Sequence, residues 1–181
     1  MAVLRADAQR NLDRILAAAA DAYAEVGPDV TIDEIARRAG VGHGTVFRRF
    51  PTKDALRAAV IAVRLDELLT HSRELLERPD PRAALEKFVW MAAEAARRDR
   101  TLFEGIEECG TFPEVAEAKR ELHEVVDKLI RRLQRLGALR RGVDSRDVGA
   151  LVGAAIKASM HAEREDAWRG YVQIVLDGLR T

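Results

Sequence analysis

The sequence lacks the features of disulfide-stabilised, membrane-spanning and secreted proteins. Its one cysteine, Cys109, cannot form a disulfide within the chain, which favours a reducing compartment. No apolar run approaches the roughly 20 residues of a membrane span. Met1 to Arg10 has neither the apolar core nor the small-residue cleavage site of a secretion signal. We therefore expect a cytoplasmic protein without a membrane partner.

Strand patterns and helix breakers are also scarce. No run alternates polar and β-branched residues, and the 181 residues include only 5 prolines and 12 glycines. Ala, Leu, Arg and Glu, which favour helix, occur throughout. A content of 48% hydrophobic and 33% charged residues excludes a disordered chain, and the length accommodates one small domain joined to a larger one. We expect an all-α fold.

Hydrophobic periodicity and capping residues predict about nine helices. Gly40 is placed to end the second helix, and Thr31 with Glu34 has the spacing of a capping box at its start. The long fourth helix carries the boundary between a first domain, residues 1–56, and a second, residues 57–181. The expected helices cover approximately residues 7–26, 31–39, 43–50, 53–77, 81–98, a short stretch from 101, 111–137, 145–162 and 165–179.

The segment from Ile32 to Phe47 predicts a helix-turn-helix. Ala36 and Ala39 are small enough for two helices to cross closely, and Gly40 is free to adopt the positive φ of a tight turn. The apolar side chains expected to fill the angle between the helices are Ile35, Val41 and Val46. A compact helical hairpin without any DNA contact would show the same pattern.

The charge distribution favours the DNA-binding alternative. The chain has 30 basic and 30 acidic residues and no net charge, but residues 35–57 carry six basic side chains against Asp54 alone. A helix from His43 to Phe50 would lie in the major groove, with Arg48 and Arg49 gripping guanine or phosphate. The six basic residues are Arg37, Arg38, Arg48, Arg49, Lys53 and Arg57.

Residues 8 to about 57 resemble the N-terminal domain of the TetR family of bacterial transcriptional regulators. Arg14–Gly27 is similar to the family's first helix, Thr31–Val41 to its second, and Gly44–Leu56 to its recognition helix and the start of the fourth. The other two-thirds of the chain fits only the family's helical pattern. The resemblance implies a homodimeric transcriptional regulator, a repressor that binds a pseudopalindromic operator in double-stranded DNA.

The resemblance also implies roles for individual residues. Thr31 and Lys53 would contact phosphates, Gly44 would let the recognition helix approach DNA, and Thr45 would touch a base or a phosphate. His43 would read a base or be merely solvated, and Arg5 and Arg10 would reach DNA or belong to a tail. The expected DNA-binding residues are Thr31, His43, Gly44, Thr45, Phe47, Arg48, Arg49 and Lys53.

Three positions depart from the family pattern. Gly42 stands where a Ser or Thr cap is usual, and Phe47 stands where a Tyr is usual. Arg48 and Arg49 stand where His or Tyr is frequent. We expect these changes to alter the operator sequence and the salt dependence of binding rather than to abolish binding.

The last two expected helices suit a dimer interface. Small residues such as Gly149, Gly153 and Ala154 let helices approach closely, and the family's equivalent pair forms a four-helix bundle with its symmetry mate. Core packing within one chain is the alternative. The expected interface residues are Leu151, Val152, Ala155, Trp168, Val172, Val175 and Leu176.

Large apolar residues in the middle of the chain suit a pocket for a small, mainly apolar effector, although core packing explains each one singly. The expected ligand-binding residues are Phe88, Met91, Phe103, Phe112 and Met160. No nucleophile–base pair, phosphate loop or metal-ligand spacing points to an enzyme, a cofactor or a metal. The acidic residues around Cys109 fit a solvated helix face better than a metal site.

Two alternatives to a ligand-released repressor stay open. One is a DNA-binding regulator, repressor or activator, without a ligand. The other is a helical protein-interaction or sensor module in which the helix-turn-helix is vestigial.

Overall fold

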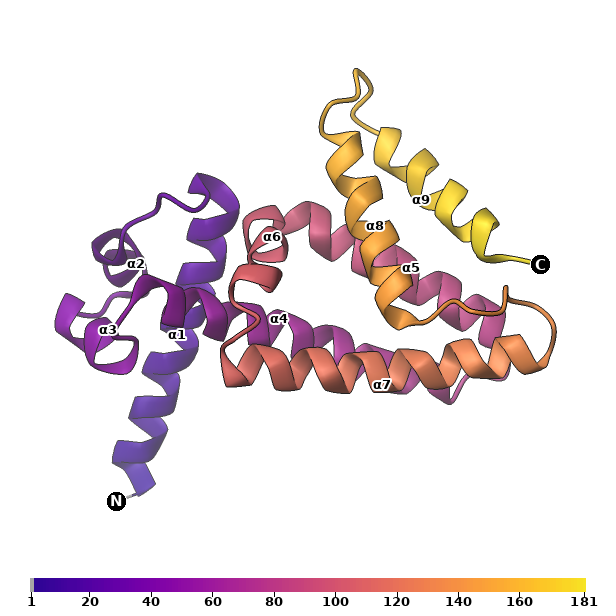
Figure 1. Cartoon of the computed structure of the whole chain (residues 1–181). Coiled ribbons are helices and arrows are strands. Elements are labelled where there is room, and N and C mark those ends of the chain that lie inside the picture. Colours follow the sequence, from indigo (N-terminus) through magenta and orange to yellow (C-terminus); the bar gives the residue numbers. More distant parts are fainter. Residues whose placement is uncertain (1) are drawn as a thin grey trace. The chain divides into compact units, whose positions relative to one another are not determined.

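The computed structural model describes the backbone of residues 2–181 and the side chains of residues 7–99 and 103–181. Within that range there are nine helices and no strand, which confirms the all-α fold (Figure 1). No helix there is both long and apolar enough to cross a membrane. The helices are α1 (Ala2–Val26), α2 (Ile32–Ala39), α3 (His43–Arg49), α4 (Lys53–Leu76), α5 (Pro81–Arg98), α6 (Arg100–Glu108), α7 (Pro113–Arg135), α8 (Ser145–Ser159) and α9 (Ala167–Leu179).

Local capping signals place the end of α2 and the start of α5. Gly40 takes the left-handed conformation at φ 65°, and its N–H donates to the carbonyl oxygens of Ala36 and Arg37. The carboxylate of Asp80 accepts from the N–H groups of Arg82 and Ala83 at 2.9 and 3.2 Å, so α5 begins at Pro81.

The capping box expected at the start of α2 is only half formed. The Thr31 hydroxyl accepts from the Glu34 N–H at 3.2 Å. The return bond, from the Thr31 N–H to the Glu34 carboxylate, is not among the hydrogen bonds of the described residues. That carboxylate accepts instead from Arg37 and Arg38, because two guanidinium groups offer it stronger charge-assisted bonds.

The chain divides into two compact units. Unit 1 comprises the residues up to Arg64 together with Asp99–Ala116, and unit 2 comprises Leu65–Arg98 and Glu117–Thr181. The division into units lies inside α4, between residues 64 and 65. The functional domain boundary at 56/57 stays a prediction. Unit 1 also takes up α6 from later in the chain. Sequence periodicity did not indicate this, because helical period reports which face is apolar and not what covers it.

In unit 1, α1 packs against both α2 and α6, and α2 packs against α3. The fully buried side chains include Ile15, Tyr23, Ile35 and Leu56. Burial raises the pKa of the Tyr23 hydroxyl to about 12. These contacts give the three N-terminal helices a continuous apolar core, which holds α3 at the surface of the unit.

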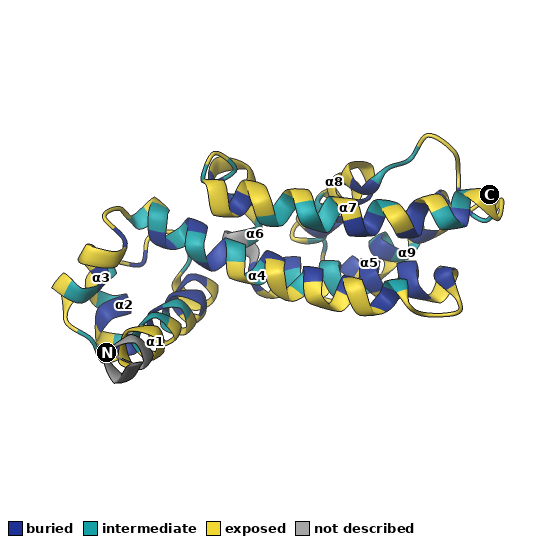
Figure 2. Ribbon diagram, turned by 90° about the horizontal axis from the view of Figure 1, so that it is seen from below, coloured by how far each residue is buried: buried dark blue, intermediate teal, exposed yellow. Residues whose placement is uncertain are grey.

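In unit 2, α5 packs against α8 and α9, which run in opposite directions side by side (Figure 1). The buried Trp168 of α9 meets Trp90 of α5 edge-on, with ring centroids 5.9 Å apart. The guanidinium groups of Arg97 and Arg169 lie 5.4 and 4.7 Å from the Trp168 ring. Figure 2 shows the buried and exposed positions that alternate along α7, as expected of an amphipathic helix.

A candidate DNA interface

The helices α2 and α3 pack against each other through a few small and apolar side chains on either side of the turn. Ile35 and Val46 are completely buried, Ala36 and Ala39 nearly so, and α2 packs against α3. The Val41 N–H donates to the Ala36 carbonyl at 3.0 Å, which closes the turn over Gly40. One face of α3 is therefore buried in unit 1 and the other faces solvent.

The residues expected to bind DNA are all accessible on unit 1. Phe47, a large apolar side chain, is 51% exposed on α3. The structure leaves Thr31, His43, Gly44, Phe47, Arg48 and Arg49 exposed, and Thr45 and Lys53 half-buried. Contacts of these residues with DNA stay predictions. The side chain of Arg5 lies outside the described residues, and Arg10 is exposed on α1.

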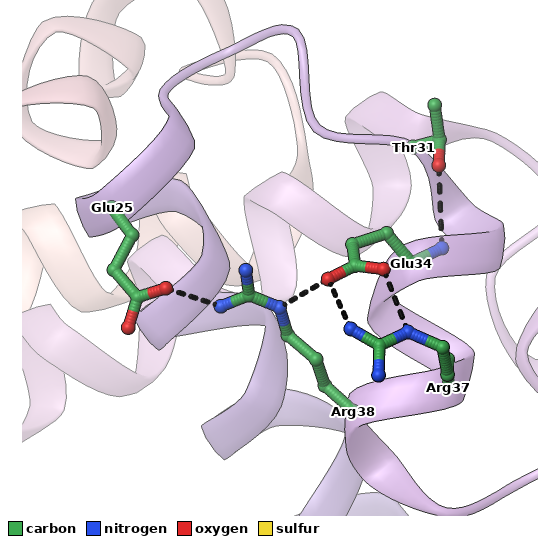
Figure 3. Close-up of polar contacts among 5 residues, drawn as sticks. All are labelled: Glu25, Thr31, Glu34, Arg37 and Arg38. Carbon is green, nitrogen blue, oxygen red and sulfur yellow. Dashed lines mark hydrogen bonds and ion pairs between the residues drawn. The ribbon is translucent and has the colours of Figure 1, made fainter.

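Three of the six basic residues between Ile35 and Arg57 have carboxylate partners. Figure 3 shows Glu34 accepting from Arg37 at 2.9 and 2.7 Å and from Arg38 at 2.8 Å, while Arg38 also donates to Glu25 at 2.6 Å. The two guanidinium groups hold the pKa of the Glu34 carboxyl at about 2. The network ties the end of α2 to the end of α1.

Among the described residues, the basic side chains without a carboxylate partner determine where positive charge remains on unit 1. In the described part of the chain, no ion pair involves Arg48, Arg49 or Lys53, whereas Arg57 donates to Glu108 of α6 at 2.6 Å. Positive charge is therefore concentrated at the end of α3 and the start of α4. The count along the sequence overstated the extent of positive charge, because the partner carboxylates of Glu25, Glu34 and Glu108 lie outside the counted segment.

Asp33, which the sequence analysis did not single out, contacts His43. Oδ1 of Asp33 lies 2.5 Å from Nδ1 of His43, and the His43 ring stacks on Phe47 with centroids 6.2 Å apart and planes at 15°. The two residues are ten positions apart and belong to different helices. No local pattern in the sequence indicates the pair, since only the turn at Gly40 brings α2 and α3 together.

Comparison with known proteins decides the family. The model for bacterial regulatory proteins of the tetR family matches residues 15–60, and the model for the C-terminal domain of SbtR-like transcriptional regulators matches residues 80–181, more than half of the chain. The chain belongs to the TetR family. The resemblance seen in the first 57 residues is thereby confirmed and extended to the C-terminal helices.

Individual relatives of known sequence or structure agree with this family assignment. A TetR transcription regulatory protein from Mycobacterium vanbaalenii is 37% identical over 98% of this chain and 99% of that one, with a TM-score of 0.66. An HTH-type transcriptional repressor from Mycobacterium tuberculosis is 47% identical over 74 residues, 40% of this chain and 37% of the relative. The match therefore spans well under half of that curated relative. FadR from Bacillus subtilis, in complex with stearoyl-CoA, shares the fold at 16% identity and a TM-score of 0.70.

The residues expected to bind a ligand are divided between the two units of this TetR-family chain. Phe103 and Phe112, both half-buried, belong to unit 1. In unit 2 Phe88 is buried, Met91 is half-buried and Met160 is exposed. A cavity of about 20 Å³ in unit 2 is lined by other residues, among them Leu85 and Leu133. Such a volume has room for one water molecule. The role of the five residues in ligand binding stays a prediction.

The residues expected at the dimer interface lie mostly inside the protomer. Leu151 is exposed and Val175 is half-buried. The other five are buried within unit 2 and pack its own core; they are Val152, Ala155, Trp168, Val172 and Leu176. Apolar residues occur on several faces of α8 and α9. The sequence therefore does not indicate which face packs within the protomer and which is exposed. The structure leaves Leu151 of α8, which belongs to the expected set, and Ile174 of α9, which does not, exposed to solvent.

Proposed function

We propose that this chain is a sequence-specific DNA-binding transcriptional regulator, a homodimeric repressor that a small, mainly apolar ligand releases from its operator. The observation that carries the proposal is the outer face of α3. It presents the exposed His43, Phe47, Arg48 and Arg49 on a helix whose other face is buried. Both arginines are free of carboxylate partners within the described residues, so their guanidinium groups are available to bases and phosphates.

An uncovered apolar surface on α8 and α9 supports the dimer. Leu151 is 45% and Ile174 is 68% exposed, although both are large and apolar. Small exposed residues accompany them, namely Ala150, Ala154, Ala158, Gly170 and Gly178. Two such surfaces can meet at close range about a two-fold axis. Two α3 helices would then enter successive major grooves about 34 Å apart, as a pseudopalindromic operator requires.

Ligand release requires a difference in affinity between two states. The ligand must bind the state that does not fit the operator more tightly than the state that does. FadR from Bacillus subtilis has the same fold and is in complex with stearoyl-CoA, which supports an effector with a long apolar part. Residues 53–76 of α4 run without interruption from unit 1 into unit 2, so a change in α4 would affect both.

The decisive experiment measures binding to DNA from immediately upstream of the chain's own gene, with scrambled DNA as the reference, at several salt concentrations. We expect tight binding to the first DNA only. The double variant Arg48→Ala, Arg49→Ala should lose about tenfold or more in affinity, because each bidentate arginine contributes roughly 1–3 kcal/mol of base discrimination. It should keep its helix content and its dimer.

A matched control is the double variant Arg140→Ala, Arg141→Ala. It removes two adjacent exposed arginines between α7 and α8 and so makes the same change in net charge. We expect it to keep operator affinity. Equal loss in both double variants would mean that binding depends only on net charge. A folded dimer that binds neither DNA would overturn the proposal in favour of a protein-interaction module.

A further inference from the structure

The imidazole of His43 is held on two sides at the start of α3. Nδ1 lies 2.5 Å from the Asp33 carboxylate, and the ring stacks on Phe47. An ionised carboxylate can only accept a hydrogen bond, so Nδ1 must carry the proton and donate it to Oδ1. Nε2 has no hydrogen-bond partner among the described residues, and the side chain is 54% exposed. In its neutral form the ring therefore has a set orientation, a set tautomer and one available nitrogen.

We infer that Asp33 is a positioning residue that presents Nε2 of His43 to a base edge in the major groove and thereby sets the operator preference at one base pair of each half-site. The inference rests on the proposed function, because it assumes that α3 lies in the major groove. It goes beyond that function in assigning base selection to a contact between α2 and α3.

The chemistry of the neutral ring indicates which bases are preferred. With the proton on Nδ1, Nε2 is an acceptor. In the major groove the donors are the N4 amino group of cytosine and the N6 amino group of adenine. A ring of the other tautomer would offer a donor at Nε2 and prefer guanine. Asp33 excludes that tautomer as long as its carboxylate accepts from Nδ1.

Asp33 places an acidic group at the surface beside α3. Its side chain is 78% exposed, and its carboxylate contacts His43 of α3. An acidic side chain near DNA repels phosphates, so the charge of Asp33 by itself weakens binding. Its position in the first turn of α2 also stabilises that helix through the helix dipole. The experiment must therefore distinguish a contribution to helix stability from a contribution to base selection.

The test selects preferred sequences from double-stranded DNA with a random segment of about 30 base pairs, enough for two half-sites one helical turn apart. The chain is compared with the variants Asp33→Ala, His43→Ala and the double variant. We expect His43→Ala to lose about tenfold or more of the preference at one base pair per half-site. Asp33→Ala should lose preference at that same pair and at no other, and the double variant should lose no more than His43→Ala.

Two further variants separate the alternatives. Asp29→Ala removes another exposed acidic charge from unit 1 and should leave the preference unchanged at every base pair. Asp33→Asn keeps an acceptor oxygen at the same position and should retain the preference, with helix content checked by circular dichroism. Loss of preference in Asp33→Asn equal to that in Asp33→Ala would overturn the role of the hydrogen bond.

The outcomes also separate this inference from the proposed function. A selected motif that His43→Ala leaves unchanged would overturn the inference alone. A uniform loss of affinity in Asp33→Ala, without a change in base preference, would assign Asp33 to helix stability and overturn it as well. If the unaltered chain selects no motif at all, both the proposed function and the inference fail.

Discussion

The guanidinium group of Arg57 fills the space that a side chain at residue 105 would need. A Cβ atom added to Gly105 would lie 2.5 Å from Nη2 and 2.6 Å from Cζ of Arg57. Arg57 is only 13% exposed and donates to Glu108, one turn further along α6, at 2.6 Å. The contact between α4 and α6 in unit 1 therefore depends on the absence of a side chain at Gly105.

Gly105→Ala is expected to destabilise the protein. The Arg57 side chain must move out of a nearly closed site and away from Glu108, and overpacking of this kind costs about 1–3 kcal/mol in free energy of unfolding. Urea unfolding measures the change. Gly44→Ala is the control, because nothing lies within 4 Å of a Cβ there and the same change in an open helix position adds roughly 0.5–1 kcal/mol. A Gly105→Ala protein as stable as this control would mean that Arg57 moves without cost.

Glu34 is expected to stay ionised in acid. Its pKa is lowered from 4.5 to about 2 by hydrogen bonds from Arg37 and Arg38. A carboxyl with a lowered folded-state pKa stabilises the fold fully above its ordinary pKa, and this contribution is lost as the pH falls from 4.5 to about 2. NMR titration of the Glu34 carboxyl carbon measures the value directly. A transition near 4.5 would contradict the network in Figure 3.

The stability of Glu34→Gln gives an independent check on the same network. The variant should unfold at lower urea concentration than the unaltered chain at neutral pH, and the difference should vanish as the pH approaches about 2. Glu74→Gln removes an exposed carboxylate on α4 that has no ion pair in the described part of the chain, and serves as the control.

Gly44→Ala is expected to separate folding from DNA binding. Nothing lies within 4 Å of a Cβ added at residue 44, so the fold should keep its stability or gain roughly 0.5–1 kcal/mol from the better helix former. Operator affinity should fall by on the order of tenfold, because the added methyl group would occupy the space between α3 and the DNA. Fluorescence anisotropy and urea unfolding give the two values. Unchanged affinity would mean that residue 44 does not face the DNA closely.

Ile174→Glu and Leu151→Glu are expected to separate the dimer into monomers. Each would place a carboxylate in the apolar surface of α8 and α9, and burying an unpaired charge should raise the dissociation constant roughly a hundredfold or more. Sedimentation velocity measures the effect. Leu136→Glu, at an exposed apolar position just after α7, is the matched control and should remain dimeric. If all three variants remain dimeric, the interface lies elsewhere on the protein.

Short-range signals account for most of what could be predicted. Gly40 ends α2 because a left-handed residue is needed there, and Asp80 with Pro81 starts α5 because both suit the first turn. The helix-turn-helix could be recognised because its small residues, turn glycine and apolar contacts lie within 16 consecutive positions. His43, Gly44, Thr45 and Phe47, which are expected to contact DNA, lie in the same segment.

Several features of the site could not be predicted, since they join residues from different helices. Glu34 lies one turn from Arg37 and Arg38 on the same helix, but only the packing of α2 on α1 brings Glu25 to Arg38. Trp168 and Val172 suited an interface by composition, yet both are buried within the protomer, where Trp168 meets Trp90 of α5.

The sequence by itself determined the nine helices, the turn at Gly40 and the exposed arginines of α3, because propensities, caps and hydrophobic period act over a few residues. The tertiary structure decided which charges are neutralised, which apolar face of α8 and α9 stays uncovered, and that Asp33 holds His43. These depend on which helices meet, and that is set by the packing of whole apolar faces rather than by any one segment.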